Sequence, residues 1–365
     1  MRPVRTLVVD DSATMRLLIG HALGRDPEIE VVGYSSDAFE AREAIKRLDP
    51  DVVTLDVEMP KMQGIEFLAH IMRLRPMPVV MVSSLTGPGT ATTIEALSIG
   101  AFDCFPKPVP ATEEAFLRLG EIVKAAAAAR RGIQTLSQRR ARQSVGGGGR
   151  EPARVAQGAA SEPPVISRAA PPVQADGAGA AAEIVVAGAS TGGIEALSTL
   201  LAQWPADCPP TLLVQHLPAG FTKGFARRLD AISPARVEEA ADGMPLERGR
   251  VYLAPGGSAH LTVGGLRPVC ALVPSEPVSG HRPSVDVLFR SVARRFGKTS
   301  VGIILTGMGS DGAAGMLDIR SAGGLAIGQD EASSLVYGMP KAAMLMDAID
   351  TQLPLESIAR HLFNG

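Results

Sequence analysis

A serine at position 190 stands in a stretch whose pattern suits a nucleophile. Residues 183–193 read E-I-V-V-A-G-A-S-T-G-G, in which the apolar run Ile184–Ala187 is broken by Gly188, and an apolar-periodic segment follows two glycines. We expect a buried strand, a sharp turn that holds Ser190, and a helix. The unpaired N–H groups at the beginning of such a helix, that of Thr191 included, could stabilise an oxyanion beside the serine. A serine at this place can also simply cap the helix or bind a phosphate.

A serine nucleophile needs a base, and three of the six histidines are candidates. His216 ends the apolar run T-L-L-V-Q-H, which is the next predicted strand after the one before Ser190. In a parallel sheet its ring can therefore emerge at the same edge as the serine. His260 falls in a hairpin-like region of alternating residues, and His281 falls in a loop. Position favours His216 and leaves the other two open.

A third predicted strand end brings a carboxylate. The buried run V-G-I-I-L-T, residues 301–306, leads into the glycine-rich turn G-M-G-S-D-G-A-A-G, which contains Asp311. A carboxylate there could accept the second ring N–H of His216 and so fix its tautomer. The glycines would also let backbone N–H groups, that of Met308 among them, approach an oxyanion. Alone, G-x-G-x-D-G would be interpreted as a helix cap.

In the N-terminal part of the chain, the polar residues that follow the predicted strands are mainly aspartates. Asp10 and Asp11 follow the first apolar run, Asp56 the third, Ser83 the fourth and Lys107 the fifth. Three carboxylates in one crevice are costly unless a hard divalent cation neutralises them, and oxygen ligands suit Mg²⁺. An isolated aspartate at a strand end is usually a helix cap, but this combination is difficult to explain as capping.

Five apolar runs separated by helical patterns predict a doubly wound parallel sheet in the N-terminal part. The carboxyl ends of its strands form one edge, where ligands bind in such sheets. The predicted strands are Thr6–Val9, Glu30–Gly33, Val52–Leu55, Pro78–Val82 and Phe102–Phe105.

Composition divides the 365 residues into three segments. Residues 129–182 hold 8 Lys and Arg against 3 Asp and Glu, with many Gly, Pro and Ala, so we expect a disordered linker. This linker separates two predicted domains, residues 1–128 and residues 183–365. The whole chain has a net charge of −2, and neither domain has a dominant basic surface, which argues against nucleic-acid binding. No long apolar run or signal-peptide pattern is present, so we expect a cytoplasmic protein without membrane insertion.

Four motifs of the segment 1–128 match one known family: V-V-D-D-S-A-T-M-R (8–16), T-L-D-V-E-M-P (54–60), M-V-S-S (81–84) and P-K-P (106–108). By these motifs the segment resembles the response-regulator receiver family, with a flavodoxin-like fold. The resemblance implies that Asp56 accepts a phosphoryl group from a histidine kinase, while Asp10, Asp11 and Asp56 hold Mg²⁺. Ser83 and Lys107 would then bind the phosphoryl oxygens.

Five motifs of the segment 183–365 match a second family, in order: G-A-S-T-G-G (188–193), Q-H-L-P-A-G-F-T (215–222), A-P-G-G-S-A-H-L (254–261), H-R-P-S-V-D-V-L-F (281–289) and L-T-G-M-G-S-D-G (305–312). By these motifs the segment resembles the catalytic domain of the chemotaxis protein-glutamate methylesterase family. The resemblance implies a mostly parallel α/β sheet with a hairpin, Ser190 as nucleophile, His216 as general acid/base and Asp311 as its orienting partner, with no cofactor for the esterase. Glutamate methyl esters on chemoreceptors would be hydrolysed to methanol and glutamate, and some members also deamidate glutamine.

The order of the two segments predicts control by phosphorylation. The resemblance implies that the receiver lies over the Ser190 edge and obstructs a bulky receptor substrate. Phosphorylation of Asp56 would then reshape the receiver face that docks on the esterase.

Two alternatives fit parts of the same pattern. G-A-S-T-G-G approximates a dinucleotide-binding loop, and Tyr337 and Lys341 have the Y-x-x-x-K spacing of an NAD(P)-dependent oxidoreductase. Two residues weaken this match. Pro340 lies within the Y-x-x-x-K stretch, which must be helical, and His216 stands where a ribose-binding acid is expected. The other alternative is a receiver joined to a non-catalytic binding module.

Overall fold

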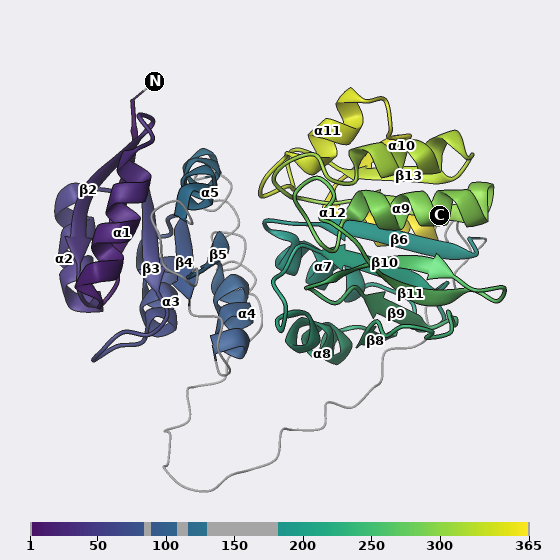
Figure 1. Ribbon diagram of the computed structural model, residues 1–365, viewed down its shortest axis with the longest axis horizontal. Helices are drawn as coiled ribbons and strands as arrows, with labels where there is room; N and C mark the ends of the chain where they lie inside the picture. The colour runs from purple at the N-terminus through teal and green to yellow at the C-terminus, as the bar shows by residue number, and fades with distance from the viewer. Residues whose placement is uncertain (1, 84–88, 108–115, 130–181, 364–365) are drawn as a thin grey trace, which may run out of the picture.

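The computed structural model describes residues 2–83, 89–107, 116–129 and 182–363. They form two domains, drawn in purple to blue and in teal to yellow in Figure 1. Most of the linker that we predict at 129–182 lies outside the described residues, so its predicted disorder stays a prediction.

The N-terminal domain is the predicted parallel sheet, with the strand order β2-β1-β3-β4-β5. Apolar side chains of α1 and α5 pack on one face of the sheet, and those of α2, α3 and α4 pack on the other. The strands are β1 (Val4–Val9), β2 (Ile29–Ser35), β3 (Val52–Asp56), β4 (Val79–Ser83) and β5 (Asp103–Pro106). The helices are α1 (Ala13–Gly24), α2 (Ala38–Leu48), α3 (Gly64–Leu74), α4 (Gly89–Ile99) and α5 (Leu117–Ala128).

The second domain is built around a larger parallel sheet, in the order β14-β13-β12-β6-β7-β9-β8. Its strands are β6 (Ile184–Ala189), β7 (Thr211–Gln215), β8 (Arg236–Glu239), β9 (Arg250–Leu253), β12 (Ser300–Ile304), β13 (Leu325–Gln329) and β14 (Thr351–Leu353). An antiparallel hairpin, β10 (Ala259–Gly264) and β11 (Val269–Pro274), lies outside this sheet. The predicted fold class, two doubly wound α/β domains with a hairpin in the second, is confirmed.

Helices cover both faces of the second sheet. Apolar residues of α7, α8 and α12 pack on one face, whereas α9, α10, α11 and the hairpin pack on the other. The helices are α7 (Gly193–Leu201), α8 (Thr222–Ile232), α9 (Val285–Phe296), α10 (Ala313–Ser321), α11 (Met339–Leu345) and α12 (Leu355–Phe363), with the 3-10 turn η2 (Gly297–Thr299) after α9. In the described part of the chain, no helix combines the length and apolar character that a membrane span requires.

The strand order places a switch point beside β6. From β6 the chain proceeds to β7 and β9 on one side of the sheet, and later returns to β12 on the other side. The loops after β6 and β12 therefore diverge and leave a crevice at the carboxyl edge, where ligands bind in open parallel sheets.

One predicted boundary was wrong. Gly188 does not break its strand, because β6 continues to Ala189. A Cβ at position 188 would come within 2.2 Å of Val285 Cγ1, so the glycine lets the beginning of α9 pack directly on β6. Its role is close approach rather than chain reversal.

Elements α4 and β5 of the N-terminal domain face the second domain (Figure 1). Ile94 of α4 is buried within the apolar cluster of the second domain. Conversely, Met308, Leu335 and Val336 pack against the apolar cluster of the first domain. The two domains thus share apolar contacts at the carboxyl edge of the larger sheet.

Candidate active site

Ser190 follows β6 directly and is fixed by backbone contacts on both sides of the crevice. Its N–H donates to Thr306 O at 3.0 Å, and its carbonyl accepts from Gly193 N at 2.8 Å and from Gln215 Nε2 at 2.9 Å. Gly192, the N-cap residue directly before α7, has φ of 80°, a left-handed conformation that favours glycine. The predicted strand, turn and helix around the serine are therefore present.

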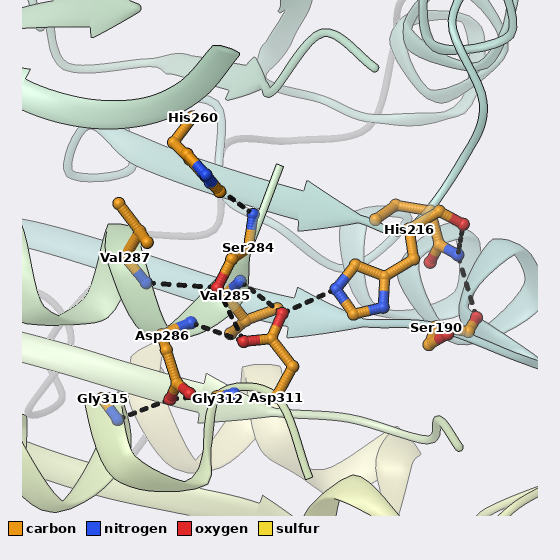
Figure 2. Close-up of polar contacts among 11 residues, drawn as sticks. Ser190, His216, His260, Ser284, Val285, Asp286, Val287, Asp311, Gly312 and Gly315 are labelled. Atoms are coloured by element: carbon orange, nitrogen blue, oxygen red, sulfur yellow. Dashed lines mark hydrogen bonds and ion pairs between the residues drawn. The ribbon is translucent and has the colours of Figure 1, made fainter. Parts of the chain in front are cut away.

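His216 lies between Ser190 and Asp311 (Figure 2). Its Nε2 is 2.8 Å from Asp311 Oδ2, and because the carboxylate can only accept, Nε2 carries the proton. Nδ1 lies on the side of the ring toward Ser190 and is buried without a hydrogen-bond partner among the described residues. The ring is thus oriented as a base, with its free nitrogen on the serine side.

Asp311 is held by the beginning of α9, a feature that the sequence analysis missed. It accepts from Ser284 Oγ at 2.7 Å, Val285 N at 2.8 Å and Asp286 N at 3.1 Å. Burial by itself favours the neutral acid, but the hydrogen bond from His216 and these donors together lower the pKa of Asp311. The carboxylate is therefore ionised and available to His216. The helix-capping pattern of Ser284 before an apolar-periodic run was the available signal.

The two helices behind the site cap each other (Figure 2). Asp286, in the first turn of α9, accepts at Oδ1 from Gly312 N at 3.0 Å and from Gly315 N at 2.7 Å, at the beginning of α10. Asp311, just before α10, accepts the N–H groups of α9. This exchange locks the turn that carries Asp311 to the helix that packs on β6.

His260 has a structural environment rather than a catalytic one. Its side chain is fully buried, and its Nδ1 accepts from Ser284 N at 3.0 Å while Nε2 donates to Glu276 O at 3.0 Å. Both ring nitrogens are therefore occupied. His260 supports the residue that caps α9, and only indirectly the acid of the site.

The two predicted oxyanion donors lie on opposite sides of the crevice. Thr191 follows the serine at the beginning of α7. Met308 follows Gly307, where an added Cβ would come within 2.8 Å of Ser190 Cβ, so the chain there passes directly beside the serine. The two loops that carry the predicted donors thus lie beside Ser190.

The predicted acidic cluster of the receiver is assembled at the edge of its sheet. One oxygen from each of Asp10, Asp11 and Asp56 lies within 4.8 Å of the others. Lys107 Nζ is 2.9 Å from Asp10 Oδ2 and 2.8 Å from Asp56 Oδ2, and Ser83 ends the adjacent strand β4. Burial raises the pKa of the Asp56 carboxyl, and the hydrogen bond from Lys107 lowers it by less, so the pKa of Asp56 is raised to about 6. Three carboxylates beside one lysine fit a hard divalent cation.

The N-terminal domain also contacts the serine edge through a polar pair. Thr191 Oγ1 donates to Asp103 Oδ2 of β5 at 2.8 Å. Burial raises the pKa of Asp103, and the hydrogen bond from Thr191 offsets this only in part. Asp103 lines, with Ser190 and His216, a cavity of about 310 Å³ between the domains. The predicted position of the receiver over the Ser190 edge matches this contact.

Fold and site together define a class: a receiver domain joined to a parallel α/β domain in which a serine, a histidine and an aspartate meet at the switch point, as in serine hydrolases. Residues 6–116 match the response regulator receiver domain, and residues 185–362 match the CheB methylesterase family. The chain belongs to the CheB family of protein-glutamate methylesterases/protein-glutamine glutaminases, which confirms both resemblances.

Relatives cover the whole chain. A protein-glutamate methylesterase/protein-glutamine glutaminase of Rhizobium johnstonii is 51% identical over 99% of this chain and 96% of its own length. One from Caulobacter vibrioides is 51% identical over 100% of this chain and 98% of its own. The solved catalytic domain of Thermotoga maritima CheB is 36% identical, over 50% of this chain and 97% of its own, with a TM-score of 0.49.

The oxidoreductase alternative is wrong. Family membership identifies the second domain as a methylesterase, which also excludes a non-catalytic binding module. Tyr337 precedes α11 instead of sharing that helix with Lys341, so the two side chains do not form a helical pair.

Proposed function

We propose that Ser190, His216 and Asp311 hydrolyse glutamate methyl esters through an acyl-enzyme. Ser190 Oγ attacks the ester carbonyl carbon while its proton passes to His216 Nδ1, and Asp311 stabilises the imidazolium through Nε2–H. The N–H groups of Thr191 and Met308 stabilise the oxyanion. The C–O bond to the methoxy group breaks, and the imidazolium protonates the leaving oxygen to give methanol. Water then attacks the acyl-enzyme by the same route and releases glutamate.

The observation that carries this proposal is the ring of His216. One nitrogen contacts a carboxylate at 2.8 Å; the other is buried, has no hydrogen-bond partner among the residues that the structure describes, and is turned toward Ser190. A buried nitrogen without a partner is costly in a structural histidine but is what a general base requires. The same site supports glutamine deamidation, because only the leaving group changes.

The receiver supplies the control. We propose that Asp56 accepts a phosphoryl group from a histidine kinase, with Mg²⁺ held by Asp10, Asp11 and Asp56. The metal would neutralise the crowded carboxylates and phosphoryl oxygens when bound. Ser83 and Lys107 lie beside Asp56 and would bind the phosphoryl oxygens, which draws β4 and β5 toward the phosphate. The movement reaches the domain contact directly, because Asp103 is in β5.

The substrates that we propose are methylated glutamates on the cytoplasmic helices of chemoreceptors. The receiver covers the serine edge in this arrangement. Its residues Asp103, Phe105 and Ile122 line the same cavity, of about 310 Å³, as Ser190 and His216. A receptor helix is about 10 Å wide, so we expect the receiver to move before such a helix reaches the serine.

Methanol release from methylated receptor membranes, measured with acetyl phosphate and Mg²⁺, tests the activity. A fluorophosphonate probe identifies the nucleophile, because a serine activated by a neighbouring base reacts with it. We expect Ser190-dependent methanol release and labelling of Ser190 alone. Labelling at another serine, or methanol release by a chain that lacks Ser190, would contradict the proposal.

Asp103→Ala is expected to raise methanol release by the unphosphorylated protein. A hydrogen bond to a charged group contributes about 1.5 to 3 kcal/mol, less the desolvation cost of the buried carboxylate, so we expect an increase of roughly 5-fold. Asp103→Asn keeps an acceptor for Thr191 and should change the activity less. Unchanged basal activity in the alanine variant would show that this bond does not hold the receiver closed.

A further inference from the structure

His281 lies flat against the proposed base. The ring centroids of His281 and His216 are 3.7 Å apart and their planes differ by 5°. The edge of the His216 ring is already used: Nε2 contacts Asp311, and Nδ1 is turned toward Ser190. His281 therefore covers a face of the ring, and its contact adds to these edge contacts without competing for them.

The loop that carries His281 is fixed by its own domain. The backbone N–H of His281 donates to Val278 O at 2.9 Å, and its carbonyl accepts from Val278 N at 3.0 Å. The neighbouring Arg282 donates from Nε to Gly257 O at 2.8 Å and from Nη1 to Ser275 O at 2.8 Å. None of these partners belongs to the receiver, so the stacked ring stays in place when the receiver moves.

The surroundings keep His281 uncharged at neutral pH. Burial lowers the pKa of His281 to about 4, and the nearby His216 and Arg118 act in the same direction, whereas Asp311 opposes them. His281 is thus neutral in this arrangement, and His216, which belongs to the same domain, continues to disfavour a charge on His281 when the receiver and Arg118 move away. A neutral aromatic face beside an imidazolium is attractive, in the manner of a cation–π contact.

We propose that His281 is a positioning residue for His216: its ring fixes the plane of the imidazole and stabilises the imidazolium that forms as Ser190 attacks. The inference rests on the proposed role of His216 as the base. The hydrogen bond from Nε2 to Asp311 restrains the imidazole at one point of its edge, whereas rotation about the Cβ–Cγ bond would swing Nδ1 away from the serine. Stacking opposes this rotation. Because the imidazolium exists only after proton transfer, the contact strengthens toward the transition state and acts on kcat.

Substitutions that keep or remove the flat ring test the proposal. They are made in the full-length protein, activated by acetyl phosphate and Mg²⁺ and assayed by methanol release. His281→Leu and His281→Gln should lower kcat roughly 10-fold with KM near the wild-type value, because the lost contact is one of aromatic stacking. His281→Phe restores a flat ring and should stay within about 3-fold of wild type. His361→Leu, at an exposed position in α12, is the matched control.

The outcomes separate this inference from the function on which it rests. Wild-type kcat in the leucine variant, or a phenylalanine variant as slow as the leucine variant, would overturn the positioning role while leaving the esterase intact. Full activity in the glutamine variant would overturn it as well, because polarity would then matter instead of stacking. Failure of the proposed function would appear in the wild-type protein, as methanol release that does not depend on Ser190. Thermal unfolding of each variant shows whether a loss of kcat reflects a loss of folded protein.

Discussion

Ser190→Ala is expected to lower methanol release by about 10⁴- to 10⁶-fold, since no other group can form the acyl-enzyme. His216→Ala should cost a similar factor, because the serine then keeps its proton. Asp311→Asn should be milder, roughly 10⁴-fold, because His216 loses its orienting carboxylate but keeps its place. The losses should not add in double variants, because the three side chains act as a unit. Initial rates of methanol release from phosphodonor-activated protein measure each factor.

The fold should survive these changes. Ser190 and His216 lie at the edge of the sheet, outside the apolar clusters on its two faces. Thermal unfolding should therefore change little for both. Asp311 is different, because it caps α9 through Ser284, Val285 and Asp286, so its asparagine variant keeps more of these contacts than an alanine would. If His260→Ala or His281→Ala abolished activity while His216→Ala kept most of it, the assignment of the base would be wrong.

Phosphorylation is expected to raise esterase activity on receptor substrate by roughly 5- to 150-fold, the range that ~1 to 3 kcal/mol of coupling supplies. The receiver contributes Asp103 and apolar side chains to the closed serine edge, and β5 connects this contact to Lys107. A chain limited to residues 183–365 should be more active than the unphosphorylated full-length protein. Acetyl phosphate with Mg²⁺ should stimulate the wild type but not Asp56→Ala.

Metal removal provides the control for this prediction. A chelator should abolish stimulation of the full-length protein by acetyl phosphate, because Asp10, Asp11 and Asp56 then repel the phosphodonor. The same chelator should leave the activity of residues 183–365 unchanged, because the proposed esterase mechanism uses no metal. Equal activity of the isolated segment and the unphosphorylated full-length protein would rule out obstruction, and would indicate that phosphorylation acts by recruitment or direct stimulation.

The sequence by itself determined the architecture and most members of the two sites. Apolar runs of strand length alternating with helical periods specify parallel α/β domains, because each strand must be buried on both faces. In such sheets the strand ends converge at one edge, so the residues after each run become neighbours. The sequence alone therefore groups Ser190, His216 and Asp311 at one edge, and Asp10, Asp56 and Lys107 at another.

Only the tertiary structure decided how those residues are used. The three candidate histidines differ through contacts with distant segments: His260 is occupied on both nitrogens, His281 stacks, and His216 alone keeps a free nitrogen toward Ser190. Likewise, the sequence predicts that Gly188 ends its strand. The structure shows instead that a glycine is required there because the beginning of α9 packs directly on the strand. A local sequence pattern determines the hydrophobic periodicity of a segment and which of its residues are polar. Partners that are far apart in the chain, such as Thr191 and Asp103 at a separation of 88 residues, are set by packing that no local pattern contains.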